Sequence, residues 1–121
     1  MITYSTAVKN SRLQAVVTAI GATGVLEIGT TGMAAVLATI PLANPAGTVN
    51  AGVLTFTAPV SDTAADSTGT AAAARIRTAT GGTDVVTGLT VGLSGTDIVL
   101  DSVSITTGQT VTITAASITH A

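Results

Sequence analysis

The spacing of apolar residues changes at Gly21, and this change constrains the fold more than any other feature of the sequence. Before Gly21, apolar residues recur mostly at intervals of three and four, which places them on one face of a helix. They are Val8, Leu13, Val16, Val17 and Ile20. After Gly21 the interval drops to two, the period of a β-strand. The sequence therefore predicts one amphipathic helix over residues 6–20, followed by β-structure.

The residues at both ends of this segment fit helix boundaries. Ser5 or Thr6 can act as N-cap, because a short hydroxyl side chain accepts a hydrogen bond from an unpaired amide of the first turn. Gly21 can adopt the left-handed conformation that ends many helices. The cations Lys9 and Arg12 fall on the flanks or polar side of the helix. We therefore expect both cations to be candidate contacts for a partner.

From residue 24 onward, apolar clusters recur about every 8–12 residues with turn residues between them, a spacing typical of β-sandwiches and barrels. We count roughly eight strands on that spacing. No exact repeat of fixed period appears, which argues against a solenoid or propeller. The predicted fold is a single mainly β domain over residues 1–121. Its antiparallel, jelly-roll-like β-sandwich spans about residues 24–120 and carries the N-terminal helix.

Four segments carry the strand predictions on which the later argument depends. "GVLEIG" places Leu26 and Ile28 on one face and Glu27 on the other. "MAAVLATIPL" is assigned as a strand that ends, or lies at a sheet edge, at Pro41, because proline cannot donate to a ladder. "AGVLTFTAP" and the tail "SVSITTGQTVTITAASITHA" also alternate. The inward residues expected in these last two segments are Leu54, Phe56, Val103, Ile105, Val111 and Ile113, with a hairpin turn at residues 107–109.

The segment "TAAAARIRTATGG" is ambiguous between helix and strand. Its alanines favour a helix, whereas the "RIRT" alternation and the glycine pair that follows favour a strand. We assign a strand with Ala72, Ala74 and Ile76 facing inward. Arg75 and Arg77 then point from its opposite face. The two arginines could contact carboxylates of a neighbouring subunit, or they could be a solvated edge that discourages aggregation.

The charge content bears on the kind of partner. Only 8% of the residues are charged and the net charge is −2, whereas an ordinary soluble domain is about 25% charged. A weakly charged surface suits burial against protein partners, and no basic cluster suggests nucleic acid. There are no cysteines, which excludes disulfides. We expect no secretory signal and no membrane span, because the apolar runs are short and interrupted.

No pattern of catalytic or metal-binding residues is visible. The carboxylates between residues 62 and 101 fall in turns and loops, where aspartate commonly satisfies backbone amides. The polar loop "SDTAADSTG" contains two of them and is long enough to be mobile or to carry contacts. His120 is the only histidine, and a serine nucleophile needs a base and an orienting group. We expect a protein that is not an enzyme and that holds no cofactor and no metal.

Threonines alternate along several segments, notably Thr55 with Thr57 and Thr110 with Thr112 and Thr114. Such rows could form a flat hydroxyl array that binds ice or glycans. Threonine is also a good strand residue, and the rows do not recur at a regular coil spacing. The strand propensity is the favoured explanation.

The phrases "MITYSTAVKNSRLQAVVTAI", "GTAAAARIR" and "GTDVVTGLTVGLSGTDIVLDSVSITTGQTVTITAASITHA" together cover most of the chain. They resemble small virion proteins encoded among the head and structural genes of tailed bacteriophages. The resemblance implies a small β-sandwich or jelly roll that acts as a capsid decoration, or cement, protein. It implies a virion location on the outer shell, the major capsid protein as partner, homo-oligomers on the shell, and no catalytic residues.

A different class remains open beside this one. A binding module on a tail or fibre, recognising a host-surface receptor or glycan, is compatible with the same fold class. Glycan platforms usually use aromatic stacking faces, and the chain has only Tyr4 and Phe56. The sequence therefore favours the decoration protein and keeps the receptor-binding module as the alternative.

Overall fold

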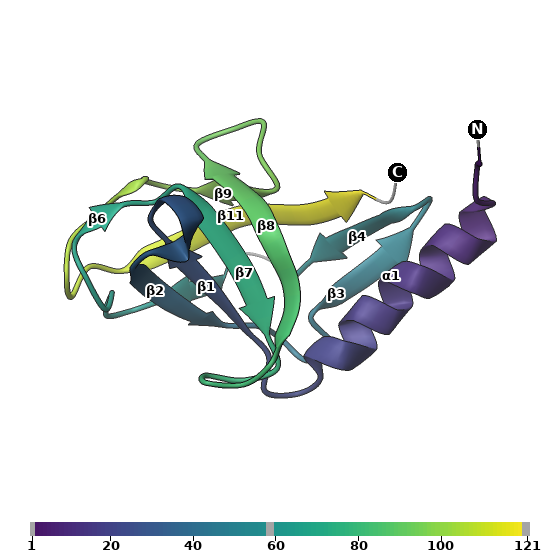
Figure 1. Ribbon diagram of the computed structural model, residues 1–121, viewed down its shortest axis with the longest axis horizontal. Helices are drawn as coiled ribbons and strands as arrows, with labels where there is room; N and C mark the ends of the chain where they lie inside the picture. Colours follow the sequence, from purple (N-terminus) through teal and green to yellow (C-terminus); the bar gives the residue numbers. More distant parts are fainter. Residues whose placement is uncertain (1, 58–59, 120–121) are drawn as a thin grey trace.

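The protein is a mainly β structure with one N-terminal helix, seen in a computed structural model that describes residues 2–57 and 60–119 (Figure 1). Helix α1 spans Thr6–Ile20 and a single 3-10 turn, η1, spans Thr31–Met33. The strands are β1 Val25–Gly29, β2 Val36–Pro41, β3 Gly47–Asn50, β4 Val53–Phe56, β5 Val60–Asp62, β6 Gly69–Thr70, β7 Ala73–Arg77, β8 Asp84–Gly92, β9 Ile98–Leu100, β10 Ser104–Ile105 and β11 Val111–Thr119.

Nine of the strands form one sheet in the order β2-β1-β7-β8-β9-β11-β4-β3, with β5 added to β11, while β10 and β6 pair separately. The large sheet curls into a sandwich-like arrangement (Figure 1). The predicted class, a mainly β sandwich with one N-terminal helix, is confirmed. One described strand pair departs from the antiparallel prediction, because Val91 and Ile98 of β8 and β9 pair in parallel. The Asp97 carboxylate accepts from the Thr90 amide at 3.0 Å and holds the short loop that turns the chain back.

The inner faces of the strands form one core of small branched side chains. The predicted inward residues of β4 and β7 are buried; they are Leu54, Phe56, Ala74 and Ile76. Strand β1 is buried on both faces, with Leu26 and Ile28 on one and Glu27 on the other. The prediction for Ala72 is wrong, because this residue is exposed and Ala71 is buried in its place. The alternation of β7 begins only at Ala73, since the chain changes direction after β6.

Helix α1 has the predicted caps but buries only part of the predicted face. Ser5 Oγ accepts from the Val8 amide at 3.3 Å, and the Gly21 amide donates to the Val17 carbonyl. Leu13, Val17 and Ile20 are buried, whereas Val8 is 43% exposed; the inward prediction for Val8 is therefore wrong. These buried residues lie between the middle of the helix and its C-terminal end, and the N-terminal turn runs past the sheet (Figure 1).

Gly24 fixes the angle at which the chain leaves α1 for β1. A Cβ atom at this position would come within 2.1 Å of Ile20 Cγ2 and 2.9 Å of the Ile20 carbonyl oxygen. Gly24→Ala should therefore lower the free energy of unfolding by about 1–3 kcal/mol through overpacking. Chemical denaturation measures the change, with the exposed Ala22→Ser as control. Equal midpoints for both variants would contradict this account of the helix–sheet junction.

The segment "MAAVLATIPL" is only partly a strand. Gly32 and Met33 both have positive φ, so the backbone turns there and β2 begins at Val36. The predicted strand start at Met33 is wrong for this reason. Pro41 is the last residue of β2, and β2 is the first strand in the sheet order. The predicted position of the proline is thus confirmed.

The turn of the C-terminal tail is confirmed but its pairing is not. The Gln109 amide donates to the Thr106 carbonyl at 2.9 Å, which closes the expected turn. The two arms do not pair with each other: β10 pairs with β6, and β11 pairs with β4, β5 and β9. Ile105, Val111 and Ile113 are nevertheless buried as predicted, and Val103 packs against the core.

The polar loop between β5 and β6 is anchored to that same turn. Ala65 is 3% exposed. Its amide donates to the Gln109 carbonyl, and its carbonyl accepts from the Gly108 amide, both at 2.9 Å. Of the two alternatives that the sequence left open for this loop, mobility or contacts, these observations favour contacts, because a buried methyl group and two backbone hydrogen bonds hold its centre.

Candidate functional surfaces

The outer side of α1 is an uncovered, mostly apolar surface. A shallow hollow of about 360 Å³ runs along it, lined by Ala7, Val8, Ser11, Arg12 and Ala15. The described part of the chain exposes four large hydrophobic residues, and three of them lie in the N-terminal half of α1 or just before it. They are Ile2 at 83%, Tyr4 at 43% and Val8 at 43%. We call the residues that line the hollow, together with Ile2 and Tyr4, the α1 outer face.

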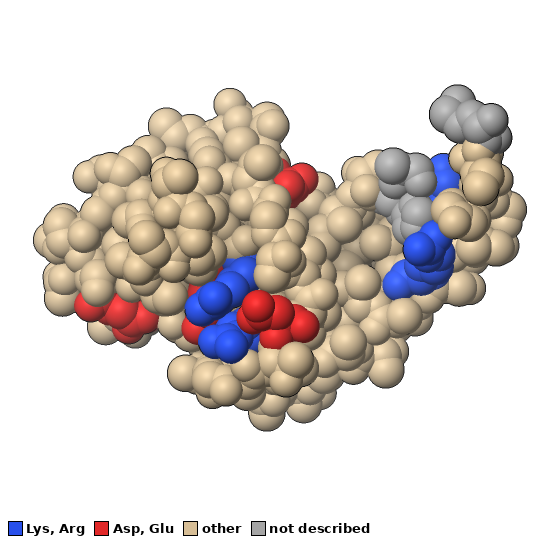
Figure 2. Space-filling model, viewed as in Figure 1, with Lys and Arg blue, Asp and Glu red and all other residues tan. Residues whose placement is uncertain are grey.

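The two cations of α1, both predicted as partner contacts, have different surroundings. Arg12 lines the hollow, and its guanidinium carbon lies 4.7 Å from the centre of the Tyr4 ring. Lys9 is half-buried near Gly52 in the β3–β4 turn, next to the hydrogen bond from the Gly52 amide to Asn10 Oδ1. In Figure 2 the helix shows blue cationic atoms with no acidic atoms beside them. The α1 outer face therefore combines apolar contact area with positive charge.

The arginines of β7 find their carboxylate partners within the chain. Arg75 Nε donates to Glu27 Oε1 at 2.6 Å, across the β1–β7 pair. The Glu27 side chain is only 7% exposed and that of Arg75 is 24% exposed. Glu27 is the one buried charged residue among those described. Since a buried carboxylate needs a partner, this ion pair explains how Glu27 can lie in a strand whose five residues are all buried.

Arg77 extends the same cluster toward β8. Its Nη1 lies 3.9 Å from Glu27 Oε1, and its Nε lies 2.9 Å from Asp84 Oδ1. The Nε–H bond is not directed at that oxygen, so Nε remains a buried donor without a hydrogen-bond partner among the described residues. Asp84 is 45% exposed, so solvent weakens its contact with Arg77.

The position of β7 inside the sheet excludes one of the two roles that the sequence suggested for Arg75 and Arg77. This strand pairs with β1 on one side and β8 on the other, so the interpretation as a solvated edge is wrong. A contact with carboxylates of a neighbouring subunit stays a prediction. The internal pairs limit it, because Nε of Arg75 is already committed to Glu27.

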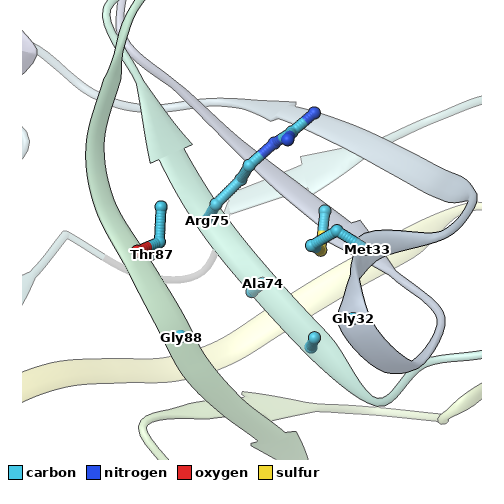
Figure 3. A pocket seen from close by; sticks show the side chains of 7 residues that line it. Gly32, Met33, Ala74, Arg75, Thr87 and Gly88 are labelled. Atoms are coloured by element: carbon cyan, nitrogen blue, oxygen red, sulfur yellow. The ribbon is translucent and has the colours of Figure 1, made fainter.

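A second hollow, of about 290 Å³, lies between η1 and β8 on the outer face of β7. Figure 3 shows its walls, with Met33 on one side, Thr87 and Gly88 on the other, and Arg75 reaching over β1. The remaining lining residues are Gly32, Ala73 and Ala74. The sequence did not indicate this hollow, because it depends on a 3-10 turn placed over a strand far along the chain.

Two of the aspartates that the sequence assigned to turns and loops accept hydrogen bonds within the fold. Asp62 accepts from the amides of Thr39 and Ala64, at 3.1 and 3.0 Å. Asp66 accepts from the Thr39 hydroxyl at 3.0 Å. These contacts fasten the loop after β5 along the outer edge of β2. A covered edge cannot add a strand from another chain, so the aspartates protect this end of the sheet.

Two hydroxyls of the C-terminal threonine row lie against backbone carbonyls of the fold. Thr114 Oγ1 donates to the Val99 carbonyl at 3.3 Å, and Thr110 Oγ1 lies 3.5 Å from the Thr63 carbonyl. Thr112 is half-buried in the part of β11 that pairs with β5. Hydroxyls used in this way stabilise the backbone, in line with the strand propensity of threonine.

Among residues 2–57 and 60–119, no group of three or more histidine, cysteine or carboxylate residues is close enough to hold a metal ion. His120 lies outside the described residues. No described helix is long and apolar enough to cross a membrane. No family model, curated protein or solved structure matches the chain.

Proposed function

We propose that the protein is a non-enzymatic virion structural protein that decorates a bacteriophage capsid. It binds the lattice of the major capsid protein through the α1 outer face and stabilises the assembled shell. The observation that carries the proposal is this face, where Val8 is exposed in the same hollow as Arg12 and Arg12 lies over the exposed ring of Tyr4. A small protein exposes such a cluster at a cost in solubility unless a partner covers it.

The chemistry of the α1 outer face favours a protein partner with acidic groups around an apolar groove. Val8 and the methyl groups of Ala7 and Ala15 offer contact area, and an amphipathic helix commonly docks into a groove in this way. Arg12 sits at the same hollow and can donate two parallel hydrogen bonds to a carboxylate. The rest of the surface is weakly charged, with only 8% charged residues in the chain.

The expected mechanism of stabilisation is mass action. A protein that binds the assembled shell but not its free subunits shifts the equilibrium toward the shell. Many identical copies act together, and association of the copies on the shell as homo-oligomers would strengthen the effect through effective concentration. A weak contact at each α1 outer face is then sufficient. The resemblance to small tailed-phage virion proteins supports the same assignment.

Purified protein should bind empty capsid shells and saturate at a fixed number of copies per shell. Sedimentation of shells with increasing protein measures the stoichiometry, and heating the loaded shells measures their added resistance. A protein that ignores shells but binds host cells would instead be the receptor-binding module. Non-saturating binding, or shells with unchanged heat resistance, would also contradict the proposal.

A further inference from the structure

Arg75 lines the hollow between η1 and β8, and its guanidinium, which reaches past the rim over β1 (Figure 3), has hydrogen-bond donors that the fold leaves unused. Arg75 commits Nε to Glu27, but its Nη1 and Nη2 have no acceptor among the described residues. The Thr87 side chain on the opposite wall is exposed and has no side-chain hydrogen-bond partner there. A guanidinium with its two terminal nitrogens free can hold a carboxylate through two parallel hydrogen bonds.

The floor and walls of the hollow are apolar and held in place. Ala73 contributes a methyl group. A Cβ atom placed on Gly32 or Gly88 would have no atom within 4 Å other than those of its chain neighbours, so both glycines border open space. Met33 packs on Gly29, where a Cβ atom would come within 2.9 Å of the Met33 sulfur. Met33 itself has φ of 58°, an uncommon conformation for a residue other than glycine. The wall that it forms is thus positioned by the backbone.

We propose that this hollow binds a carboxylate carried on a short branched apolar group. The apolar part fills the space beside Ala73, Met33 and Gly88, and the carboxylate bridges the Arg75 terminal nitrogens. The volume of about 290 Å³ is near the lower limit of ligand pockets, so it suits a group the size of one amino-acid side chain. A free small acid and the carboxyl terminus of a peptide ending in leucine present the same chemistry.

The two arginines and two carboxylates of this cluster cancel in charge, so a ligand carboxylate would be held by the unused donors of Arg75 and not by an excess of positive charge. Arg75 and Arg77 face Glu27 and Asp84, and Glu27 is shared between both arginines. Arg77 also contacts a second carboxylate, that of Asp84, whereas Arg75 contacts only Glu27. Arg77 Nε also lacks a hydrogen-bond partner among the described residues, but Arg77 does not line the hollow, whereas Arg75 does. This site is separate from the α1 outer face, so the inference does not depend on shell binding.

The test is a titration of the isotope-labelled full chain with 4-methylpentanoate, followed by the amide chemical shifts of Gly32, Met33 and Gly88. The neutral 4-methylpentanamide has the same shape and serves as ligand control. Acetyl-Gly-Gly-Leu with a free carboxyl terminus, and its carboxamide, form the peptide arm. Saturable shifts with either carboxylate, and weaker shifts with its amide, support the proposal. Their relative affinity separates the free acid from the peptide terminus as source.

Two variants and one control locate the site. Ala73→Leu fills the hollow and leaves the ion pairs intact, and Arg75→Gln removes the donors. Each should weaken carboxylate binding by about tenfold or more, as expected for loss of a charge-assisted contact or of its apolar seat. Arg12→Gln, on the helix, should leave it unchanged. If Arg75→Gln does not fold, Ala73→Leu decides alone.

Two results overturn the proposal. One is equal shifts with acids and amides, since Arg75 would then not select the carboxylate. The other is undiminished binding by Ala73→Leu, which would place the ligand elsewhere. Shell binding by Ala73→Leu should equal that of the unaltered protein, so a failure here is distinguishable from a failure of the capsid proposal.

Discussion

Val8→Asp should weaken binding to empty shells on the order of 100-fold, the effect of losing a central interface contact and burying an unpaired charge. Val8 lines the hollow of the α1 outer face and is 43% exposed. An aspartate there disturbs little in the free protein, but it becomes desolvated when a partner covers the helix. Sedimentation with shells measures the affinity, and thermal unfolding shows that the free protein is intact.

Gln14→Asp is the matched control for this prediction. Gln14 is exposed on the same helix but does not line the hollow. It introduces the same charge outside the proposed contact and should bind shells within about twofold of the unaltered protein, as is usual for a rim or surface site. If Val8→Asp binds as tightly as Gln14→Asp, the α1 outer face is not the contact surface.

Glu27→Gln should lower the free energy of unfolding by about 2–4 kcal/mol, because removal of one member of a buried ion pair leaves the other uncompensated. The substitution keeps the shape of the side chain. It leaves Arg75 Nε and Arg77 Nη1 without the carboxylate that both of them face. Chemical denaturation at constant pH measures the loss.

Asp84→Asn offers the same chemical change at an exposed position. Asp84 is 45% exposed and pairs with Arg77 only, so the expected loss is within about 1 kcal/mol and shrinks at high salt. A double-mutant cycle between Glu27→Gln and Arg75→Gln should show strong coupling, because the two residues share one hydrogen bond. Equal losses for Glu27→Gln and Asp84→Asn would show that burial does not strengthen this cluster.

Local patterns in the sequence were sufficient for the helix and for most of the core. Ser5 and Gly21 mark the ends of α1 as predicted, since caps depend on neighbouring residues. Leu54 and Ile76 are buried as their alternation indicated. Val8 was misplaced, because its spacing fits the apolar face but the sheet does not extend far enough to cover it.

Features that depend on pairing between distant segments could not be read from the sequence. The tail shows its turn at residues 107–109, but nothing local states that β10 pairs with β6 or that β8 pairs with β9 in parallel. The same limit hid the ion pair between Glu27 and Arg75, which are 48 residues apart. A lone glutamate inside an apolar strand was the available signal, since a carboxylate there needs a cationic partner.

The central claim is that α1 fastens this protein to a capsid shell, and an image of loaded shells tests it most directly. Empty shells saturated with purified protein should show, by electron cryo-microscopy, ordered density at fixed lattice positions. In that density the α1 outer face, with Val8 and Arg12, should contact the shell. Density in which α1 points into solvent, or shells without ordered added density, would contradict the account.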